Sequence, residues 1–373
     1  MTIEKVFLKI YPELNLGDDL FLKIILDRYP HTRFYLNAGS EYKDIFKNNS
    51  NLTVFSSINK VSLYKRGVNF IIRKFWPSKY RDTLVKTIKK NNEAYFNNTD
   101  AFVSIGGSIF MQPKILPYYY CIEYYKLINL YYKQNPKFYI GCNFGPFLDN
   151  NFKEEYESIF KKATDVCFRE DYSKKLFNNL TNVRYKPDVV FGLNVNKSDK
   201  EKKSVGFSII SARGAIDSEE YIHKYAELIS YYQRKGYKIY LFSFCKKEGD
   251  EETINNILKL LDKKDNINSV FYRGNIESFL KIYSSVEQVY CGRFHSMILS
   301  MLYSQKIYPV IYSDKMTNVL KDISYKGDVV FMKDFHLLDP KHLFETINSN
   351  SYDIDNEAKE AVKQFEILDK HLS

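Results

Sequence analysis

At the centre of this chain lies the stretch Gln288-Val289-Tyr290-Cys291-Gly292-Arg293-Phe294-His295-Ser296-Met297-Ile298-Leu299-Ser300-Met301. Val289 to Cys291 predicts a short buried strand, and Phe294 to Leu302 is apolar enough for a buried helix. Gly292 allows a tight turn between them. A second strand from Ile307 to Tyr312 follows, and the turn Ser313-Asp314-Lys315 then opens another helix. The stretch therefore predicts parallel strands joined by helices.

Two side chains that could take part in binding or catalysis lie at the turn of this stretch. Arg293 and His295 occupy the end of the strand and the first residues of the helix. Backbone N–H groups at a helix N-terminus have no intrahelical partner, so an anion is favoured there. An arginine and a histidine beside them can hold a phosphate or carboxylate next to a proton donor. From this stretch alone, a surface pair or a helix-terminus contact is an equal alternative.

The rest of the 373-residue chain alternates strands and helices. We expect strands at 5–10, 32–36, 52–55, 101–105, 137–141, 165–168, 204–210, 238–242 and 269–272. We expect helices from a cap at 15–18 to about 29, and at 43–47, 117–133, 154–163, 173–178, 218–234, 251–261, 276–283 and about 356–372. This alternation predicts an α/β fold with parallel sheets covered on both faces.

A polar, mostly charged run at 194–203 is the expected linker between two domains. The predicted domains are 1–195, with a basic insertion at 60–90, and 203–350. The helix at 355–373 is expected to pack back on the first domain. Two such domains in tandem direct their strand C-terminal ends to a shared cleft, where we expect the active site. The loops expected there are 15–18, 106–108, 143–145, 243–246 and 293–295, together with Arg169.

Several classes of site are disfavoured by what the sequence lacks. It contains no GxGxxG fingerprint, no GxxxxGK[ST] loop and no HExxH motif, and Gly106-Gly107 can be a plain tight turn. The five cysteines form no CxxC pair, so we expect neither a disulfide framework nor a metal site. No signal peptide or membrane-spanning run is recognised, so a cytoplasmic protein is expected. No cofactor is expected either, because no cofactor-binding motif is recognised.

The net charge of +10 is concentrated in residues 60–90, which hold ten Lys or Arg and one acidic residue, Asp82. Aromatic residues, including Phe75 and Trp76, are interspersed among these cations. This mixture suits an anionic membrane surface, which would make the protein peripheral at the inner face of the membrane. A solvated basic helix face is the alternative. Nucleic acid is not expected, because no nucleic-acid motif accompanies the patch.

Short motifs in a fixed order carry a family resemblance. They are Asn15-Leu16-Gly17-Asp18, then Ser104-Ile105-Gly106-Gly107-Ser108, Gly141-Cys142-Asn143-Phe144-Gly145-Pro146, Phe168-Arg169-Glu170-Asp171-Tyr172-Ser173, Pro187-Asp188-Val189-Val190-Phe191, Gly292-Arg293-Phe294-His295-Ser296 and Ser313-Asp314-Lys315. Each motif is weak, but the ordered set, from about residue 10 to 325, resembles the polysaccharide pyruvyl transferase family. Residues 55–95 and those after 330 carry no matching motif. Cys142 stands where a Gln is common in the family, which bears on acceptor choice.

The resemblance implies two Rossmann-like domains in a GT-B-like arrangement and a specific reaction. Pyruvate would pass from phosphoenolpyruvate to two hydroxyls of one sugar of a surface polysaccharide, such as a capsule or exopolysaccharide, giving a cyclic ketal and phosphate. The family pattern places Arg169, Arg293 and His295 at the donor. With Phe294 and Lys315 they form the expected donor site. The expected acceptor and cleft residues are Asn15, Gly17, Asp18, Gly106, Gly107, Ser108, Asn143 and Gly145.

The chemistry fits these residue types. Two guanidinium groups can bind the carboxylate and the phosphate of the donor, and His295 is the expected general acid. The helix N-terminus disfavours a charged imidazole and the anionic donor favours it, so His295 should carry its extra proton mainly when donor is bound. Two alternatives stay open: a nucleotide-sugar glycosyltransferase of the same architecture, and a non-catalytic module that docks on membranes. The sugar, its lipid linkage and the oligomeric state are not predicted.

Overall fold

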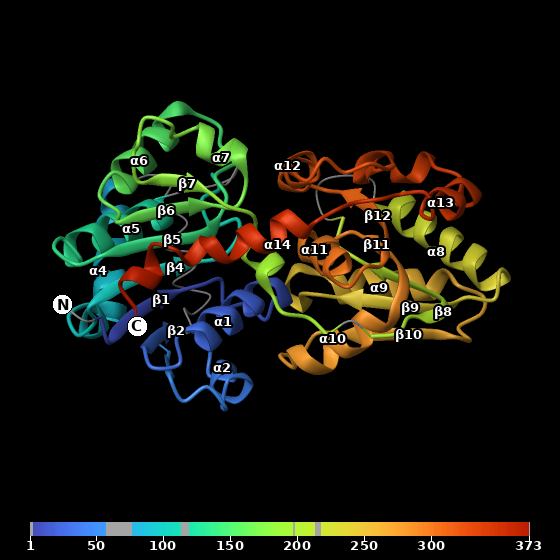
Figure 1. Ribbon diagram of the computed structural model, residues 1–373, viewed down its shortest axis with the longest axis horizontal. Coiled ribbons are helices and arrows are strands. Elements are labelled where there is room, and N and C mark those ends of the chain that lie inside the picture. Colours follow the sequence, from blue (N-terminus) through green and yellow to red (C-terminus); the bar gives the residue numbers. More distant parts are fainter. Residues whose placement is uncertain (1–2, 57–76, 113–118, 197, 213–217, 373) are drawn as a thin grey trace. The chain divides into compact units, whose positions relative to one another are not determined.

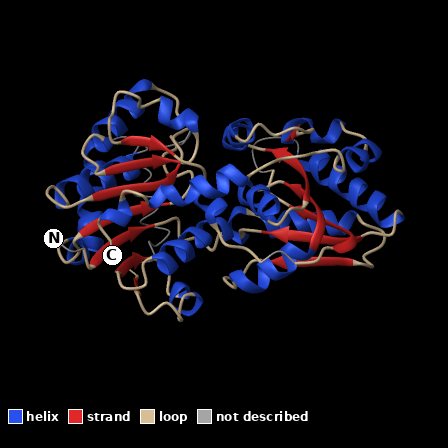
Figure 2. Ribbon diagram, in the orientation of Figure 1, coloured by secondary structure: helices blue, strands red, loops and turns tan. Residues whose placement is uncertain are grey.

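The computed structural model describes residues 3–56, 77–112, 119–196, 198–212 and 218–372. The chain forms two compact units (Figure 1). Unit 1 comprises Met1–Pro12, Phe21–Lys186 and Lys363–Ser373, and unit 2 comprises Glu13–Leu20 and Pro187–Val362. Each unit is a parallel sheet flanked by helices (Figure 2). The predicted α/β class with two Rossmann-like domains is confirmed.

Unit 1 is built on a seven-stranded parallel sheet in the order β3-β2-β1-β4-β5-β6-β7. The strands are β1 (Lys5–Lys9), β2 (Arg33–Asn37), β3 (Leu52–Phe55), β4 (Ala101–Ile105), β5 (Lys137–Cys142), β6 (Asp165–Phe168) and β7 (Val183–Tyr185). The helices are α1 (Leu16–Arg28), α2 (Glu41–Ile45), α4 (Pro77–Phe96), α5 (Tyr119–Tyr131), α6 (Asn150–Phe160) and α7 (Asp171–Lys175). The first residues of α1 belong to unit 2.

Aromatic side chains fill most of the core of unit 1. Phe102 and Tyr139 point from the sheet into the same cluster as Tyr125 of α5 and Tyr156 and Phe160 of α6. Their rings meet mainly edge to face, the arrangement favoured by the ring quadrupoles. Large rings therefore fix α5 and α6 against one face of the sheet, which leaves the strand C-terminal ends to carry the loops.

Unit 2 has a six-stranded parallel sheet in the order β10-β9-β8-β11-β12-β13. The strands are β8 (Glu201–Ser208), β9 (Lys238–Ser243), β10 (Ile267–Phe271), β11 (Val286–Cys291), β12 (Lys306–Ile311) and β13 (Val330–Phe331). The α-helices are α8 (Ser218–Arg234), α9 (Asp250–Leu260), α10 (Ile276–Ser285), α11 (Phe294–Leu302), α12 (Asp314–Asp322), α13 (Pro340–Thr346) and α14 (Asp355–Ala361). Short 3-10 turns are η1 (Val189–Gly192), η2 (Lys246–Glu248) and η3 (Met332–Leu337).

Two sequence predictions about elements need correction. The polar run at 194–203 is not linker throughout, because β8 begins at Glu201 and pairs with both β9 and β11. The single helix expected at about 356–372 is broken into α14, η4 (Val362–Phe365) and η5 (Leu368–Lys370). At the break, Arg184 donates to the carbonyls of Lys363 (2.6 Å) and Gln364 (2.7 Å), which are groups that a continuous α-helix would bond to its own N–H groups.

Gln364 fastens this C-terminal segment to unit 1. Its fully buried side chain accepts from the N–H of Gly141 (3.0 Å) and donates to the carbonyls of Phe168 (3.2 Å) and Lys186 (2.7 Å). One amide thus bonds three backbone groups near β5, β6 and β7, of which the Phe168 carbonyl also accepts the Lys186 N–H at 3.0 Å. Residues 363–370 are therefore an integral part of unit 1.

The basic stretch is described only in part. Residues 60–76, which include Arg73, Lys74, Phe75 and Trp76, lie outside the described residues. Residues 77–90 are helical, as the start of α4, and there Arg81 pairs with Glu123 of α5 at 2.5 Å. In the described part of the chain, no helix combines the length and the apolar character needed to cross a bilayer.

Candidate functional site

The turn after β11 brings the backbone of unit 2 into close contact. A Cβ at Gly292 would overlap the carbonyl oxygen of Ser208 at the end of β8, and the Gly292 N–H donates to that same oxygen at 3.0 Å. Glycine is therefore needed for close approach of two adjacent strand ends. This contact fixes where the next residue, Arg293, leaves the sheet.

Arg293 precedes α11, whose first turn is closed by a local hydrogen-bond pair. The hydroxyl of Ser296 donates to the carbonyl of Arg293 (2.6 Å) and accepts from its N–H (3.3 Å). Arg293 itself has extended backbone angles, as an N-cap residue should. Every residue of α11 except His295 is buried, as the sequence predicts. The helix is thus a rigid support for the side chains at its start.

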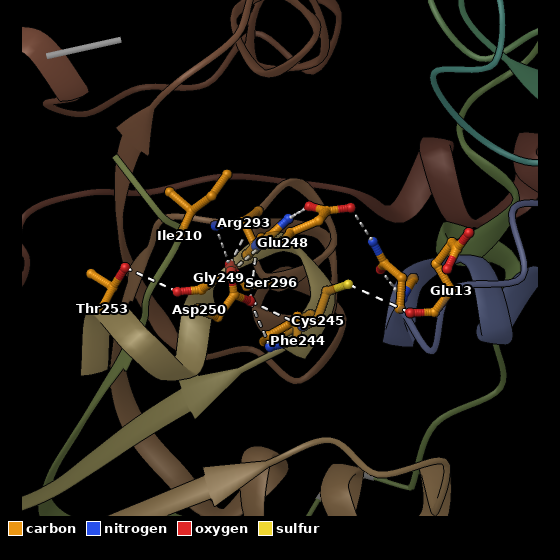
Figure 3. A network of polar contacts seen from close by, with 12 residues as sticks. Glu13, Ile210, Phe244, Cys245, Glu248, Gly249, Asp250, Thr253, Arg293 and Ser296 are labelled. Atoms are coloured by element: carbon orange, nitrogen blue, oxygen red, sulfur yellow. Dashed lines mark hydrogen bonds and ion pairs between the residues drawn. The ribbon is translucent and has the colours of Figure 1, made fainter. Parts of the chain in front are cut away.

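The guanidinium of Arg293 is surrounded by two carboxylates (Figure 3). Its Nε donates to Oδ2 of Asp250 at 3.2 Å, its Nη2 pairs with Oδ1 of the same residue, and its Nη1 pairs with Glu248. The three side chains are 7% (Arg293), 0% (Asp250) and 34% (Glu248) exposed. A fork-like contact with one fully buried carboxylate gives Arg293 a single orientation.

Asp250 links Arg293 to the loop after β9. Its Oδ2 also accepts the backbone N–H groups of Phe244 and Cys245, both at 3.0 Å (Figure 3). Burial raises the pKa of Asp250, against the opposing pull of the guanidinium. The two acids do not behave alike, because burial raises the pKa of Glu248 as well but Arg293 outweighs that effect and holds it below the ordinary value. Glu248 is therefore ionised at neutral pH.

The segment 13–20 is fixed on the same loop of unit 2. Asn15 forms an isolated antiparallel bridge with Cys245, and its side-chain amide donates to Glu248 at 3.3 Å. The Leu16 N–H donates to the Phe244 carbonyl at 3.1 Å. The side-chain oxygen of Asn15 accepts the N–H of Gly17 at 3.0 Å and so opens α1. Asn15 thereby connects the Arg293 cluster to the residue that contacts His295.

His295 lies between Gly17 and Asp188. A Cβ at Gly17 would overlap Nδ1 of the imidazole, so only glycine admits the ring in this position. On the other side, Nε2 of His295 lies 3.8 Å from Oδ2 of Asp188, which is fully buried and caps η1 by accepting the Val190 N–H at 2.9 Å. The side chain of His295 is 11% exposed. The ring thus lies between the Gly17 backbone and a buried carboxylate that would stabilise an imidazolium.

The remaining predicted residues of unit 2 lie farther from His295. The Phe294 ring lies 5.1 Å from the imidazole, and the Lys315 ammonium lies 5.5 Å from the centre of the Phe294 ring. Lys315 also contributes to the charge environment of Glu248. Asp18 stands in the first turn of α1 and is partly exposed. The structure therefore brings Asn15, Gly17, Arg293, Phe294, His295 and Lys315 together within unit 2.

A second cluster forms in unit 1 around Arg169, after β6. Its buried guanidinium donates to the side-chain oxygen of Asn143 (2.7 Å) and contacts the Ser108 hydroxyl (3.5 Å). Ser108 donates to the same oxygen of Asn143 at 3.0 Å. A Cβ at Gly107 would lie 3.2 Å from both Nη atoms, so glycine lets the guanidinium rest on the backbone.

Two further glycines of this cluster need their left-handed backbone. Gly106 has φ 122° and Gly145 has φ 100°, values that L side chains rarely adopt. The N–H of Asn143 donates to the Gly107 carbonyl at 3.1 Å, which joins the loops after β4 and β5. Gly106, Gly107, Ser108, Asn143, Gly145 and Arg169 thus form one set within unit 1.

Sequence reasoning missed three acids of unit 2: Asp188, Glu248 and Asp250. Asp188 stood within one of the ordered motifs, Pro187-Asp188-Val189-Val190-Phe191, but received no role. Glu248 and Asp250 flank Gly249 in a stretch with no recognised pattern, and their contact with Arg293 depends on the adjacency of β9, β8 and β11. Within the described residues, no group of three or more His, Cys, Asp or Glu is arranged to hold a metal ion.

Solved structures with the same fold come from another group of proteins. UDP-GlcNAc 2-epimerase from Methanocaldococcus jannaschii, in complex with UDP-GlcNAc and UDP, has a TM-score of 0.59 at 11% identity, over 98% of this chain and 99% of that one. MnaA from S. aureus, with UDP, has a TM-score of 0.60 at 8% identity, over 99% and 98%. Anabaena HepE, with UDP and glucose, has 0.54 at 11%, over 99% and 97%. These likenesses show a fold of the GT-B type.

Family membership rests on the sequence match rather than on the fold. No curated protein matches the chain. The family described as polysaccharide pyruvyl transferase matches residues 15–314, which is most of the 373 residues. The matched range begins at Asn15 and includes Arg169, Asp188, Arg293 and His295. The chain therefore belongs to the polysaccharide pyruvyl transferase family, a family of enzymes.

Proposed function

We propose that this enzyme transfers pyruvate from phosphoenolpyruvate to two hydroxyls of one sugar in a surface polysaccharide precursor. The products are a cyclic pyruvate ketal and phosphate. The observation that carries the proposal is His295, held between Gly17 and the buried Asp188 at the start of α11. These three residues lie within the range that matches the family.

His295 suits the first chemical step, protonation of the methylene carbon of the donor. That proton turns the carbon–carbon double bond into a methyl group and leaves an oxocarbenium-like centre at C2. One sugar hydroxyl adds to C2, phosphate leaves, and the second hydroxyl closes the ketal. The two hydroxyls lose two protons: one replaces the proton donated by His295, and the other leaves with the phosphate. Asp188 would stabilise His295 while it carries the proton to be delivered.

The arginines supply charge for an anionic donor. Arg293 lies two residues before His295 and is oriented by Asp250, and a guanidinium fork matches carboxylate and phosphate oxygens. Arg169 is also proposed to bind the donor, because it lies in the ordered motif at 168–173. The glycines and amides of both clusters are proposed to contact the sugar. No cofactor is required by these steps.

The decisive experiment combines phosphate release with mass spectrometry. The purified protein is incubated with phosphoenolpyruvate and a panel of galactose- and mannose-type saccharides, free and lipid-linked. We expect phosphate release that depends on one acceptor, together with the mass gain of a pyruvate ketal. Acceptor-independent phosphate release, or none with any saccharide, would count against the proposal. His295→Gln serves as the matched inactive control.

A nucleotide-sugar glycosyltransferase remains the second candidate, because the structures of similar fold are described with UDP or UDP-GlcNAc. The same assay separates the two. Release of UDP from a UDP-sugar, with transfer of the sugar to an acceptor and no reaction of phosphoenolpyruvate, would select this alternative.

We also propose that residues 60–90 hold the enzyme against an anionic membrane, at the cytoplasmic face, beside a lipid-linked acceptor. The charge of this stretch supports the proposal, since each Lys or Arg near an anionic bilayer adds about 1 kcal/mol of attraction. Salt screens that attraction. Vesicle binding should therefore require anionic lipid, fall as salt rises, and weaken when Arg73, Lys74, Lys79 and Arg81 are neutralised. A wild type that ignores anionic vesicles at low salt would disprove it.

A further inference from the structure

We propose that Glu248 occupies the place on Arg293 that the anionic donor takes, and that it turns away when the donor binds. Glu248 is then a built-in competitor that sets donor affinity. The inference rests on the proposed function, because it takes Arg293 as a ligand of the donor. It is carried by a contrast between the two carboxylates that contact this arginine.

Asp250 is the fixed partner of Arg293. Its side chain is fully buried and makes four polar contacts: two with the guanidinium and two with the backbone N–H groups of Phe244 and Cys245. Moving it would leave two buried N–H groups without this acceptor, which is unfavourable. Asp250 therefore stays with Arg293 in every state of the site.

Glu248 is the exchangeable partner. Its side chain is 34% exposed, and it contacts Nη1 of Arg293 and, at 3.3 Å, the amide of Asn15. It ends the short turn η2 and is followed by Gly249, whose φ of 92° is a left-handed conformation. Asn15 would keep its bridge to Cys245 and its contact with the Gly17 N–H after Glu248 had left.

Charge balance gives the contact a direct effect on ligand binding. With both carboxylates in place, Arg293 and its two partners carry a net charge of −1. An incoming donor with a carboxylate and a phosphate is repelled by that charge and finds Nη1 occupied. When Glu248 turns outward, the remaining pair is neutral, Nη1 is available, and Lys315 adds positive charge nearby. Binding of the donor must therefore displace one internal carboxylate.

A conventional supporting role makes the opposite prediction. If Glu248 simply positioned Arg293, removal of its charge would loosen the guanidinium and weaken donor binding. If it competes with the donor, the same change should strengthen binding. The sign of the effect therefore decides between the two roles without any knowledge of the acceptor sugar.

The test is calorimetric binding of phosphoenolpyruvate, and separately of inorganic phosphate, to the wild type and to Glu248→Gln. We expect Glu248→Gln to bind both anions about tenfold more tightly, since the neutral amide no longer opposes an anion at Nη1 of Arg293. Glu248→Ala should shift affinity in the same direction. Glu13→Gln is the matched control: Glu13 lies in the same unit and pairs with Lys247 rather than Arg293, so its affinity should equal that of the wild type.

Each outcome has one meaning. Tighter binding in both Glu248 variants, with Glu13→Gln unchanged, supports the competitor. Equal or weaker binding in variants that melt at the wild-type temperature overturns it, and the proposed function stands as long as the wild type binds phosphoenolpyruvate. If neither the wild type nor Glu248→Gln binds phosphoenolpyruvate, the inference and the proposed donor fail together.

Discussion

Each of the two units places a buried arginine after a strand of its sheet, and different side chains contact the two guanidinium groups. Arg169 in unit 1 and Arg293 in unit 2 are both buried, with 2% and 6% exposure. The contacts described above for Arg169 are with neutral groups, the oxygens of Asn143 and Ser108 and the backbone at Gly107. Arg293 contacts two carboxylates, and its neighbour His295 lies beside a third.

This contrast assigns different work to the two clusters. Asn143, Ser108 and the backbone at Gly107 help to orient the guanidinium of Arg169. The carboxylates of unit 2 regulate charge, because they oppose Arg293 and would favour a protonated His295. We therefore propose that proton transfer and control of donor affinity belong to unit 2, and three variants can test that division.

The largest effect is expected from His295→Gln. The substitution keeps a hydrogen-bonding side chain of similar size but cannot deliver a proton, so turnover should fall by about a hundredfold or more. Donor binding should change little. His31→Gln, at an exposed histidine of unit 1, should leave turnover unaltered. Near-normal turnover of His295→Gln across the pH range would assign the proton donor to another group. Proton transfer would then no longer be a role of unit 2.

A pair of glycine substitutions should give the next largest effect. Gly17→Ala places a methyl group on the imidazole and must displace His295, so turnover should fall on the order of tenfold to a hundredfold. Gly107→Ala meets Arg169 only at 3.2 Å, so a shift of a few tenths of an ångström should accommodate it with little loss. Kinetics and thermal melts of both variants check this. Equal loss of activity in the two would mean that the glycines serve the same purpose.

Exchange of the arginines for lysine should have the smallest effect on the reaction. Either variant keeps its charge but loses the planar fork, so affinity for phosphoenolpyruvate should fall about tenfold, the equivalent of about 1.4 kcal/mol. Arg293→Lys should in addition lower the melting temperature by about 2–4 °C, because Asp250 loses its two-pronged partner. Arg33→Lys, at an exposed arginine, is the control. Unchanged affinity in both variants would exclude them from the donor site.

Much of the fold follows from local sequence patterns. The helix α8 has the predicted bounds of 218–234, and the strands β3, β4 and β6 also agree with their predicted ranges. These elements have strong periodicity or short apolar runs between turn residues. The two-residue strand β13 and the three-residue strand β7 were missed, because each is too short to show a pattern and exists through pairing with a neighbour.

The sequence motifs predicted several residues of the candidate site, but they did not predict which side chains these residues contact. The sequence indicated Arg293 and His295 from a strand–turn–helix pattern, and the ordered motifs indicated Arg169. Asp250 precedes its partner Arg293 by 43 residues, and Asp188 precedes its neighbour His295 by 107 residues. Their approach is a product of strand order and of η1, which no local pattern encodes. Ion pairs between distant residues are set by topology, and only the folded chain reveals them.

Gln364 has a consequence for the order in which the molecule is made. The described strands of unit 1 are all synthesised by Tyr185, yet three backbone groups near β5, β6 and β7 bond an amide that lies 178 residues beyond Lys186. All of the sheet of unit 2 emerges from the ribosome in that interval. The unit begun first is thus finished second, so a nascent chain halted before residue 363 would carry a complete second sheet and a first sheet that lacks the three hydrogen bonds of Gln364.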